Sequence, residues 1–398
     1  MYTTKRVSVA ATAAAFLGLG LVSPQVAADI PCGEPVEDDA PELYPMPDDD
    51  KWGYVDADGE WAIEPQWSRV KDFHEGRAIV ETVPARDPEN RMRSSGRWTV
   101  IDTEGEPILE SAIDARGSSG SGEDIVGTRS ISDYSEGCAV IEGSSDHHWI
   151  DRDGEKWQVA DISEELAETD IDEVGRFSEG RARVRIEIET DGNFPDRKNG
   201  WINADGEVVI EPQFEDAGLF AEGKAPVATD RREWTYVDEA GEFVFPDMEL
   251  QRASSFSAGW ASVTSPRGAD ISRGHIDHEG EFMNLDSLGA DGESRPSVSR
   301  LGSFNDGLAQ VHVGDGGRVE GPVYIDPDGE LAFELSEKID TELCNRAPGF
   351  HQGRIRLLVA RDAEAGCGEE NFGAEHADYE TARYVYLDTD GDVVLEQE

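Results

Sequence analysis

Residues 51–67 read KWGYVDADGEWAIEPQW, and this stretch decides the fold class. The pair Tyr54 and Val55 leads into a turn that begins at Asp56 and ends at Gly59, and an apolar run starts at Trp61. Alternating large residues favour a pleated strand. Asp56 can accept hydrogen bonds from turn amides, and Gly59 supplies a positive φ, as in a type I turn that closes on a bulge. The stretch therefore predicts a β-hairpin.

The same hairpin pattern recurs along the whole chain. An Asp or Asn followed three residues later by Gly occurs at 56–59, 102–105, 151–154, 203–206, 238–241, 277–280, 326–329 and 388–391. An aliphatic residue precedes every copy, and an aromatic residue usually stands before it, as Trp201 does ahead of the turn that ends in Gly206. The chain is therefore expected to contain eight such hairpins.

A second motif alternates with the hairpins and reads aromatic-x-x-Gly-x-small-x-aliphatic. It occurs at 73–80, 134–141, 177–184, 220–227, 256–263, 304–311 and 350–357. Six of the seven copies begin with Phe, including those with the pairs Phe73 and Gly76, Phe177 and Gly180, Phe220 and Gly223, Phe256 and Gly259, and Phe304 and Gly307. We interpret the motif as a tight turn that leads into a short strand, with the aromatic ring packed on the core.

One hairpin and one such strand make a three-stranded unit of about 35 residues, which insertions lengthen. The run 51–67, with Trp52 and Gly53 near its start, resembles the consensus of the WG repeat, and 177–182 is similar to its second half. Residues 200–220 match the whole unit, whereas 96–142 and 322–357 are degenerate. The resemblance implies a repeat architecture over about 51–397 and a binding or scaffold role. It transfers no catalytic residue.

Two all-β architectures fit an array of about seven to eight such hairpin or three-stranded units. The units can close into a propeller-like ring, or they can stack as an open β solenoid. Eight hairpins alternate with seven Phe-x-x-Gly strands, so one hairpin is left over. The surplus hairpin could cap a solenoid or complete a shared blade. We favour the ring because small blades with glycine and aromatic turns suit it.

The chain divides into three parts. Residues 1–28 have a basic start, an apolar stretch and a small-residue end at Ala28, which is typical of a cleaved signal peptide. Residues 29–50 are acidic and rich in proline, and we expect an extended, weakly ordered segment there. Residues 51–398 form the repeat domain. We therefore expect an extracytoplasmic protein, either periplasmic or secreted.

The charge of the chain is extreme. Asp and Glu number 86 against 35 Lys and Arg, which gives a formal net charge of −51, and only 7 of the basic residues are Lys. Acidic surfaces that are poor in Lys are typical of proteins from salt-rich environments, where ions screen the self-repulsion. We predict a halophilic protein that binds neither nucleic acid nor, after signal cleavage, a membrane surface.

The four cysteines are Cys32, Cys138, Cys344 and Cys367. Export would make disulfides possible, although buried free thiols are the alternative. Cys344 and Cys367 flank one predicted strand and could close a loop. Because no Cys-x-x-Cys spacing exists, we expect no structural zinc site.

We predict no catalytic, cofactor-binding or metal-binding residues. The Asp-x-x-Gly turns lack the length of an EF-hand loop, so they hold at most weak surface calcium through their acidity. The neighbours His147 and His148 should point to opposite sides of a strand, which disfavours a shared metal. Four repeated tryptophans could form a sugar-stacking row, but we expect them to be core residues: Trp52, Trp98, Trp201 and Trp234.

The leading hypothesis is a non-enzymatic binding or scaffold protein that recognises a protein or an envelope polysaccharide. The alternatives are a propeller-type glycan hydrolase with carboxylates on its loops and a structural surface protein that holds cations. Insertions at 82–96, 187–199 and 360–382 are the candidate partner loops. Five arginines in or beside these loops could form a basic patch for an anionic group: Arg86, Arg91, Arg93, Arg197 and Arg383.

Overall fold

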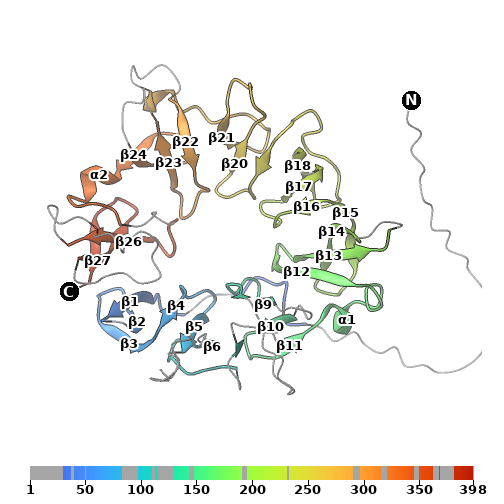
Figure 1. Ribbon diagram of the computed structural model, residues 1–398, viewed down its shortest axis with the longest axis horizontal. Coiled ribbons are helices and arrows are strands. Elements are labelled where there is room, and N and C mark those ends of the chain that lie inside the picture. Colours follow the sequence, from blue (N-terminus) through green and yellow to red (C-terminus); the bar gives the residue numbers. More distant parts are fainter. Residues whose placement is uncertain are drawn as a thin grey trace, which may run out of the picture.

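Eight small antiparallel sheets follow one another around a ring in the computed structural model (Figure 1). The structure describes residues 30–36, 40–49, 51–82, 97–109, 113–114, 130–142, 148–190, 195–230, 233–289, 296–314, 321–344, 349–361, 367 and 381–397. Each sheet is termed a blade, and the blades are numbered in chain order. The repeats close into a propeller-like ring rather than an open solenoid, and the predicted all-β repeat class is confirmed.

Each blade is a meander of strands paired in chain order, and its first strand lies toward the centre of the ring (Figure 1). Blade one contains β1 (Tyr44–Asp48), β2 (Lys51–Val55) and β3 (Trp61–Trp67), and blade two contains β4 (Arg69–Val70), β5 (Ala78–Thr82), β6 (Arg97–Ile101) and β7 (Ile113–Asp114). Blade three contains β8 (Ser130–Ile131), β9 (Cys138–Glu142), β10 (His148–Asp151) and β11 (Lys156–Trp157). Blade four contains β12 (Ile171–Ser178), β13 (Arg181–Ile188), β14 (Asp196–Asn203) and β15 (Val208–Phe214).

The second half of the ring repeats this plan. Blade five contains β16 (Asp216–Ala217), β17 (Lys224–Asp230) and β18 (Glu233–Asp238), and blade six contains β19 (Arg252–Ala253), β20 (Ala261–Thr264) and β21 (Arg273–Ile276). Blade seven contains β22 (Val298–Leu301), β23 (Ala309–Val313), β24 (Gly321–Ile325) and β25 (Leu331–Glu334). Blade eight contains β26 (Arg354–Ala360), β27 (Ala382–Asp388) and β28 (Val393–Glu396). Short helical segments lie between blades: α1 (Val159–Ile162), η1 (Asp286–Leu288) and α2 (Leu335–Lys338).

The Asp-x-x-Gly hairpins have the predicted geometry. The N–H of Gly59 donates to the carbonyl oxygen of Asp56 at 3.1 Å, and the N–H of Asp56 donates to that of Glu60 at 2.9 Å. The Asp56 carboxylate accepts the amides of Asp58 and Glu60 at 3.0 Å each. Gly59 has a φ of 86°, which closes the turn on a bulge. These acids therefore hold their own turns together.

Each Phe-x-x-Gly motif forms a two-residue turn, one in each of blades two to eight. In blade four this turn is Glu179-Gly180, and Ser178 pairs with Arg181 across it. The φ values of the two turn residues are 53° and 69°. Two successive positive φ values are typical of a type I′ turn, whose twist matches that of the flanking strands. The predicted tight turn thus has its glycine at the second position and an ordinary residue at the first.

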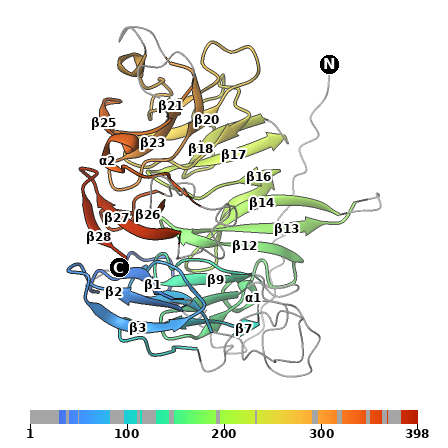
Figure 2. The ribbon, with the colours of Figure 1, turned by 60° about the vertical axis from the view of Figure 1, so that its left-hand side comes forward.

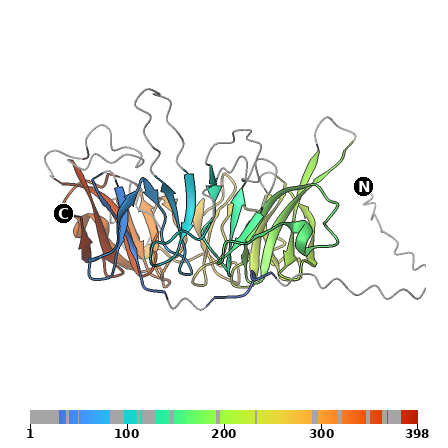
Figure 3. The ribbon, with the colours of Figure 1, turned by 90° about the horizontal axis from the view of Figure 1, so that it is seen from below.

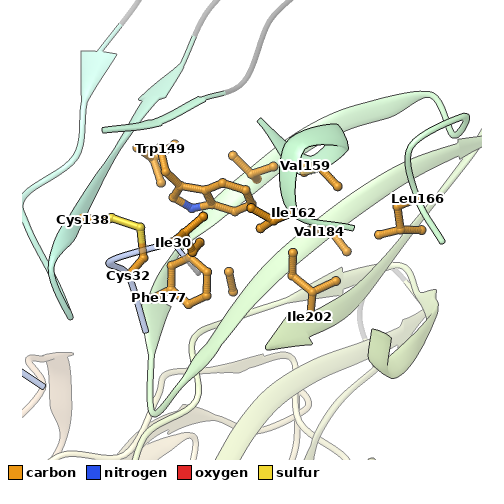
Figure 4. Close-up of a cluster of buried hydrophobic side chains, with 13 residues drawn as sticks. Ile30, Cys32, Cys138, Trp149, Val159, Ile162, Leu166, Phe177, Val184 and Ile202 are labelled. Carbon is orange, nitrogen blue, oxygen red and sulfur yellow. A yellow bond between two sulfur atoms is a disulfide. The ribbon is translucent and has the colours of Figure 1, made fainter. Parts of the chain in front are cut away.

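The core consists of clusters that neighbouring blades share. Figure 4 shows the cluster between blades three and four, in which Trp149 and Phe177 pack together with their ring centroids 5.4 Å apart. Both side chains are fully buried, as are the corresponding aromatic residues of the other repeats, namely Tyr54, Phe73, Trp201, Phe220, Tyr236, Phe304 and Tyr324. A ring of blades buries both faces of most sheets, which explains how a chain of modest hydrophobicity forms a core.

The segment before the repeats is not the weakly ordered stretch that its composition predicts. Ile30 and Cys32 are buried in the cluster of Figure 4, and a disulfide joins Cys32 to Cys138 of β9. The N–H of Gly33 donates to the carbonyl oxygen of Glu136 at 2.8 Å. Residues 30–36 and 40–43 then lie along one face of the ring on the way to blade one (Figure 3). We refer to residues 30–36 and 40–43 as the strap.

The strap leads into β1, which completes the surplus hairpin. β1 pairs antiparallel with β2, with Tyr44 opposite Val55. β1 also packs against blade eight, where the hydroxyl of Tyr386 donates to the carbonyl oxygen of Pro45. The proline-rich segment thus supplies the strand that blade one lacks, and this packing closes the ring.

The ring has two chemically different faces. The two-residue turns and the Asp-x-x-Gly hairpins lie on one face, together with the strap; this is the turn face. In blades two to eight the strand that follows the two-residue turn ends on the opposite face, because neighbouring strands are antiparallel. The connections that leave from these strand ends lie on this face, the connection face. Figures 2 and 3 show β13 and β14 of blade four reaching out on that side.

Candidate binding site

The turn face is cross-linked from blade to blade by carboxylates. Glu75 accepts the amide N–H groups of Glu136 and Gly137 at 2.6 and 2.9 Å, and Glu136 in turn accepts that of Gly180 at 2.9 Å in the next blade. Three further carboxylates each accept a backbone N–H group from the next turn along the ring. Glu179 accepts that of Gly223, Glu222 that of Gly259, and Asp306 that of Gly353. We refer to these contacts as the carboxylate–amide relay. The acids of this relay are occupied by the protein's own amides.

Burial raises the pKa of Glu136, and the two amides that it accepts act against that rise. Ala258 replaces the acid in blade six, so the relay is interrupted there among the described residues. The five relay acids of the turn face are therefore engaged by backbone amides of the next blade.

The connection face differs in that its connections vary in length from blade to blade. The connection is 231–232 between β17 and β18 of blade five, 189–195 between β13 and β14 of blade four, 83–96 between β5 and β6 of blade two, and 361–381 between β26 and β27 of blade eight. The corresponding turn on the opposite face has two residues in every one of these blades. A constant face and a variable face are typical of repeat proteins that bind through one side.

The predicted basic patch is not assembled by the two arginines that the structure describes. Arg197 lies on β14 of blade four and pairs with Glu187 and Asp172, at 2.6 and 2.9 Å. Arg383 lies on β27 of blade eight and pairs with Glu396. Blades four and eight stand on opposite sides of an eight-blade ring (Figure 1). The other three candidates, Arg86, Arg91 and Arg93, lie outside the described residues.

The candidate loop in blade four is shorter than the sequence predicts. The predicted insertion 187–199 includes the ends of β13 and β14, and Asn199 is fully buried, with its side-chain amide donating to the carbonyl oxygens of Phe214 and Glu215. The connection proper is therefore 189–195. Deleting the whole predicted range would remove part of the blade.

Other candidate groups have structural surroundings. Trp201 is buried core, while Trp52, Trp98 and Trp234 are half-buried in their blades. His148 contacts the side chain of Gln158 at 2.7 Å, and His147 lies outside the described residues. In the described part of the chain, no group of three or more His, Cys, Asp or Glu side chains is arranged to hold a metal ion.

Both possible disulfides are formed. Cys32 pairs with Cys138, and Cys344 pairs with Cys367, which closes the loop that the sequence suggested. In the described part of the chain, no helix is long and apolar enough to cross a bilayer.

A cavity of about 490 Å³ lies between blade seven and the segment that leads from it to blade eight. Its floor is formed by one face of β22, β23 and β24, and its far wall by α2 and the residues that follow it; α2 lies beside blade seven in Figures 1 and 2. The aliphatic lining residues are Leu301, Pro322, Leu335, Ile339 and Leu343, and the polar ones are Arg300, Gln310, His312, Ser336 and Thr341.

The cavity lies near the connection face. Arg300 is two residues from the start of β22, and His312 is one residue from the end of β23, directly opposite it in the strand register. The side-chain amide of Gln310 donates to the hydroxyl of Tyr324 at 3.1 Å. Burial lowers the pKa of His312, and the neighbouring Arg300 lowers it further. Both effects favour the neutral form of the His312 imidazole.

Sequence analysis did not single out these cavity residues. The signal is the alternation of buried Ala309, Val311 and Val313 with Gln310 and His312, which points one polar side of β23 away from the core. The same alternation occurs in β13 and β20, so the path of residues 335–343 across this side is what distinguishes blade seven.

The described strands define an all-β ring of short repeats with one constant face and one variable face. Comparison with known protein families confirms the repeat: the WG containing repeat matches residues 52–82, 164–187 and 200–230. The chain therefore matches this repeat at three segments within residues 52–230. No curated protein matches the sequence.

Solved structures show only loose similarity. BamB from Moraxella catarrhalis is 13% identical with a TM-score of 0.39, over 81% of this chain and 92% of that one. Apo AztD from Citrobacter koseri is 10% identical with a TM-score of 0.39, over 89% and 93% of the respective chains. Because these scores are below 0.5, the assignment of a ring rests on the described strands.

Proposed function

We propose that this chain is a non-enzymatic binding and scaffold protein that acts outside the cytoplasm and recognises a protein or a cell-envelope polymer through its connection face. The observation that carries the proposal is the contrast between the two faces. Two-residue turns and the carboxylate–amide relay hold the turn face in one arrangement, whereas the connection face offers a different connection in each blade. A rigid scaffold with variable connections is the usual basis of recognition by repeat proteins.

Location outside the cytoplasm is supported by two observations. The first is the basic start and apolar stretch of residues 1–28. The second is that all four cysteines are paired, which suits an oxidising compartment. Ile30, the second residue after the expected cleavage point, is buried in the core, so the mature chain would begin where the fold begins. N-terminal sequencing of the native protein should start at or near Asp29, and an intact Met1 would refute export.

The binding role is tested by shortening two connections together. Residues 83–96 and 189–195 would each be replaced by a short Gly-Ser linker, which leaves every strand of blades two and four intact. Envelope proteins and polymers retained by the wild-type protein should be lost from the variant, while its melting temperature stays unchanged.

The matched control alters the opposite face. Asp58→Ala and Asp328→Ala change two exposed hairpin tips on the turn face and should leave partner retention intact. If the shortened variant keeps the partner while the turn-face variant loses it, the connection face is not the binding surface.

A further inference from the structure

The cavity beside blade seven has an unusual composition for this chain. Asp and Glu number 86 of 398 residues, yet no carboxylate is among the described residues that line it. Among the described lining residues Arg300 is the one with a charged side chain, and five of the eleven are aliphatic. A cavity of about 490 Å³ lies within the usual size range of small-ligand sites, which are mostly apolar with a few polar groups.

Arg300 is exposed at the edge of the cavity, and it differs from the arginines of blade four in its partners. Arg183, Arg185 and Arg197 of blade four each pair with acids at short range. Among the described residues Arg300 forms no ion pair, and the only charged group that influences the neighbouring His312 is Arg300 itself. In a molecule of net charge −51, a cation without a carboxylate at the edge of a cavity is a place where an incoming anion meets attraction.

We propose that this cavity binds a small amphipathic carboxylate, such as a medium-chain alkanoate. The carboxylate would lie at Arg300, where a guanidinium can donate two parallel hydrogen bonds. The amide of Gln310 and the ring of His312 stand on the neighbouring strand and offer further polar contacts. The hydrocarbon chain would lie against Leu335, Ile339 and Leu343, whose burial from water supplies the apolar share of the binding energy.

This site is independent of the macromolecular partner proposed above. Its ligand is a small molecule, and its lining residues belong to blade seven and to 335–343, not to the connections of blades two and four. Loss of partner retention and loss of alkanoate binding can therefore be observed separately.

The probe is decanoate, titrated calorimetrically into the full-length mature protein in molar sodium chloride. Decanol carries the same chain without the charge, and acetate carries the charge without the chain. Decanoate should bind at one site per chain, and both comparison compounds should bind at least about tenfold more weakly, because each lacks one half of the recognition.

The matched variants are Arg300→Gln and Arg273→Gln. Arg273 is an exposed arginine on β21 of blade six and does not line the cavity. Arg300→Gln should weaken decanoate by about tenfold or more, and Arg273→Gln should leave it unchanged. Thermal melting of both variants checks that the ring is intact.

A second variant, Thr341→Trp, fills the cavity from its wall and should abolish decanoate binding without removing any charge. If decanoate does not bind at all, binds Arg300→Gln as tightly as the wild type, or is matched by decanol, the proposal is wrong.

Discussion

Glycine has two different physical roles in the repeat. Gly53 and Gly200 stand where a larger residue would collide with the neighbouring strand. An added Cβ would lie 2.4 Å from the carbonyl oxygen of Ile63 or Ile210, because the returning strand bulges toward the glycine there. Both bulges contain a Glu-Pro-Gln sequence. The Trp-Gly pair of the repeat and its Pro-Gln are thus two sides of one close contact between strands.

At Gly223 the reason is backbone conformation alone. Its φ is 75°, and an added Cβ would meet no atom within 4 Å. Gly223→Val should therefore lower the free energy of unfolding by about 1–3 kcal/mol through backbone strain, without any steric collision. Urea unfolding in molar salt measures the change.

The matched control is Ala258→Gly, since Ala258 already occupies the strained first position of the blade-six turn with a φ of 53°. That variant should be at least as stable as the wild type. A Gly223→Val variant of wild-type stability would mean that the turn relaxes at no cost.

His74 is the residue whose protonation should couple to folding. Burial lowers its pKa, and so does His351, whose ring centroid lies 4.3 Å away; Asp133, at 3.8 Å, acts in the opposite direction. The unfolded chain, with a histidine pKa of about 6.5, therefore binds the proton more readily than the folded one. Stability that is present above pH 6.5 is lost as the pH falls through that value.

The test compares the urea midpoints of wild type and His74→Gln from neutral pH down to about pH 5.5, a window set by the ordinary histidine pKa. The wild type should lose more stability than the variant over this range. Parallel pH profiles would show that His74 does not contribute. The carboxylates of the surface titrate equally in both proteins and cancel in the comparison.

At the scale of the element, the two-residue turn is a joint between blades as well as a turn. Its first residue is held at positive φ in all seven copies, and in Glu75, Glu136, Glu179, Glu222 and Asp306 the side chain reaches the amides of the next turn. The strained backbone and the long acidic side chain are linked, because this conformation aims the carboxylate along the ring.

Glu136→Ala tests this joint. The substitution leaves the amides of Glu179 and Gly180 without their acceptor. It should cost about 1–3 kcal/mol of unfolding free energy, the range for hydrogen bonds to a charged group. Urea unfolding of the variant measures this loss. The control Glu104→Ala removes an exposed acid at a hairpin tip on the same face and should be nearly neutral. Equal losses of unfolding free energy in the two variants would show that the relay contact does not stabilise the ring.

At the scale of the whole molecule, the two disulfides constrain the chain unequally. Cys32–Cys138 spans 106 residues and ties the strap to blade three, whereas Cys344–Cys367 spans 23 residues. Loop-closure entropy grows with the length of the loop, so replacing both cysteines of the first bond by serine should cost about 1 kcal/mol more than the same change in the second. Urea unfolding of the two double variants decides the order, and an inverted order would contradict the entropic argument.

The net charge of −51 acts on the molecule as a whole. Self-repulsion between carboxylates falls as ions screen it, with a screening length of about 10 Å at 0.1 M and about 3 Å at 1 M salt. The melting temperature should therefore rise by several degrees from dilute buffer to molar sodium or potassium chloride. Calorimetry at matched pH measures the rise. A melting temperature that does not depend on salt would argue against adaptation to a salt-rich environment.

The sequence by itself determined the repeating elements. Asp56 and Gly59 specify a hairpin through local hydrogen bonds and backbone conformation, and Glu179 with Gly180 specifies a tight turn in the same way. These are contacts between residues within a few positions of each other, so they can be deduced from spacing alone. The core role of Phe177 and Trp201 follows equally from the alternation along their strands.

Only the tertiary structure decided how the ring of blades is closed and where a cavity forms beside it. Tyr44 and Cys32 belong to a segment whose proline and acid content predicts weak order, and they become core only because blade one lacks a strand and Cys138 lies within reach. Arg300 and His312 line a cavity only because residues 335–343 cross that side of blade seven. Such outcomes depend on contacts between distant parts of the chain, and local periodicity carries no information about them.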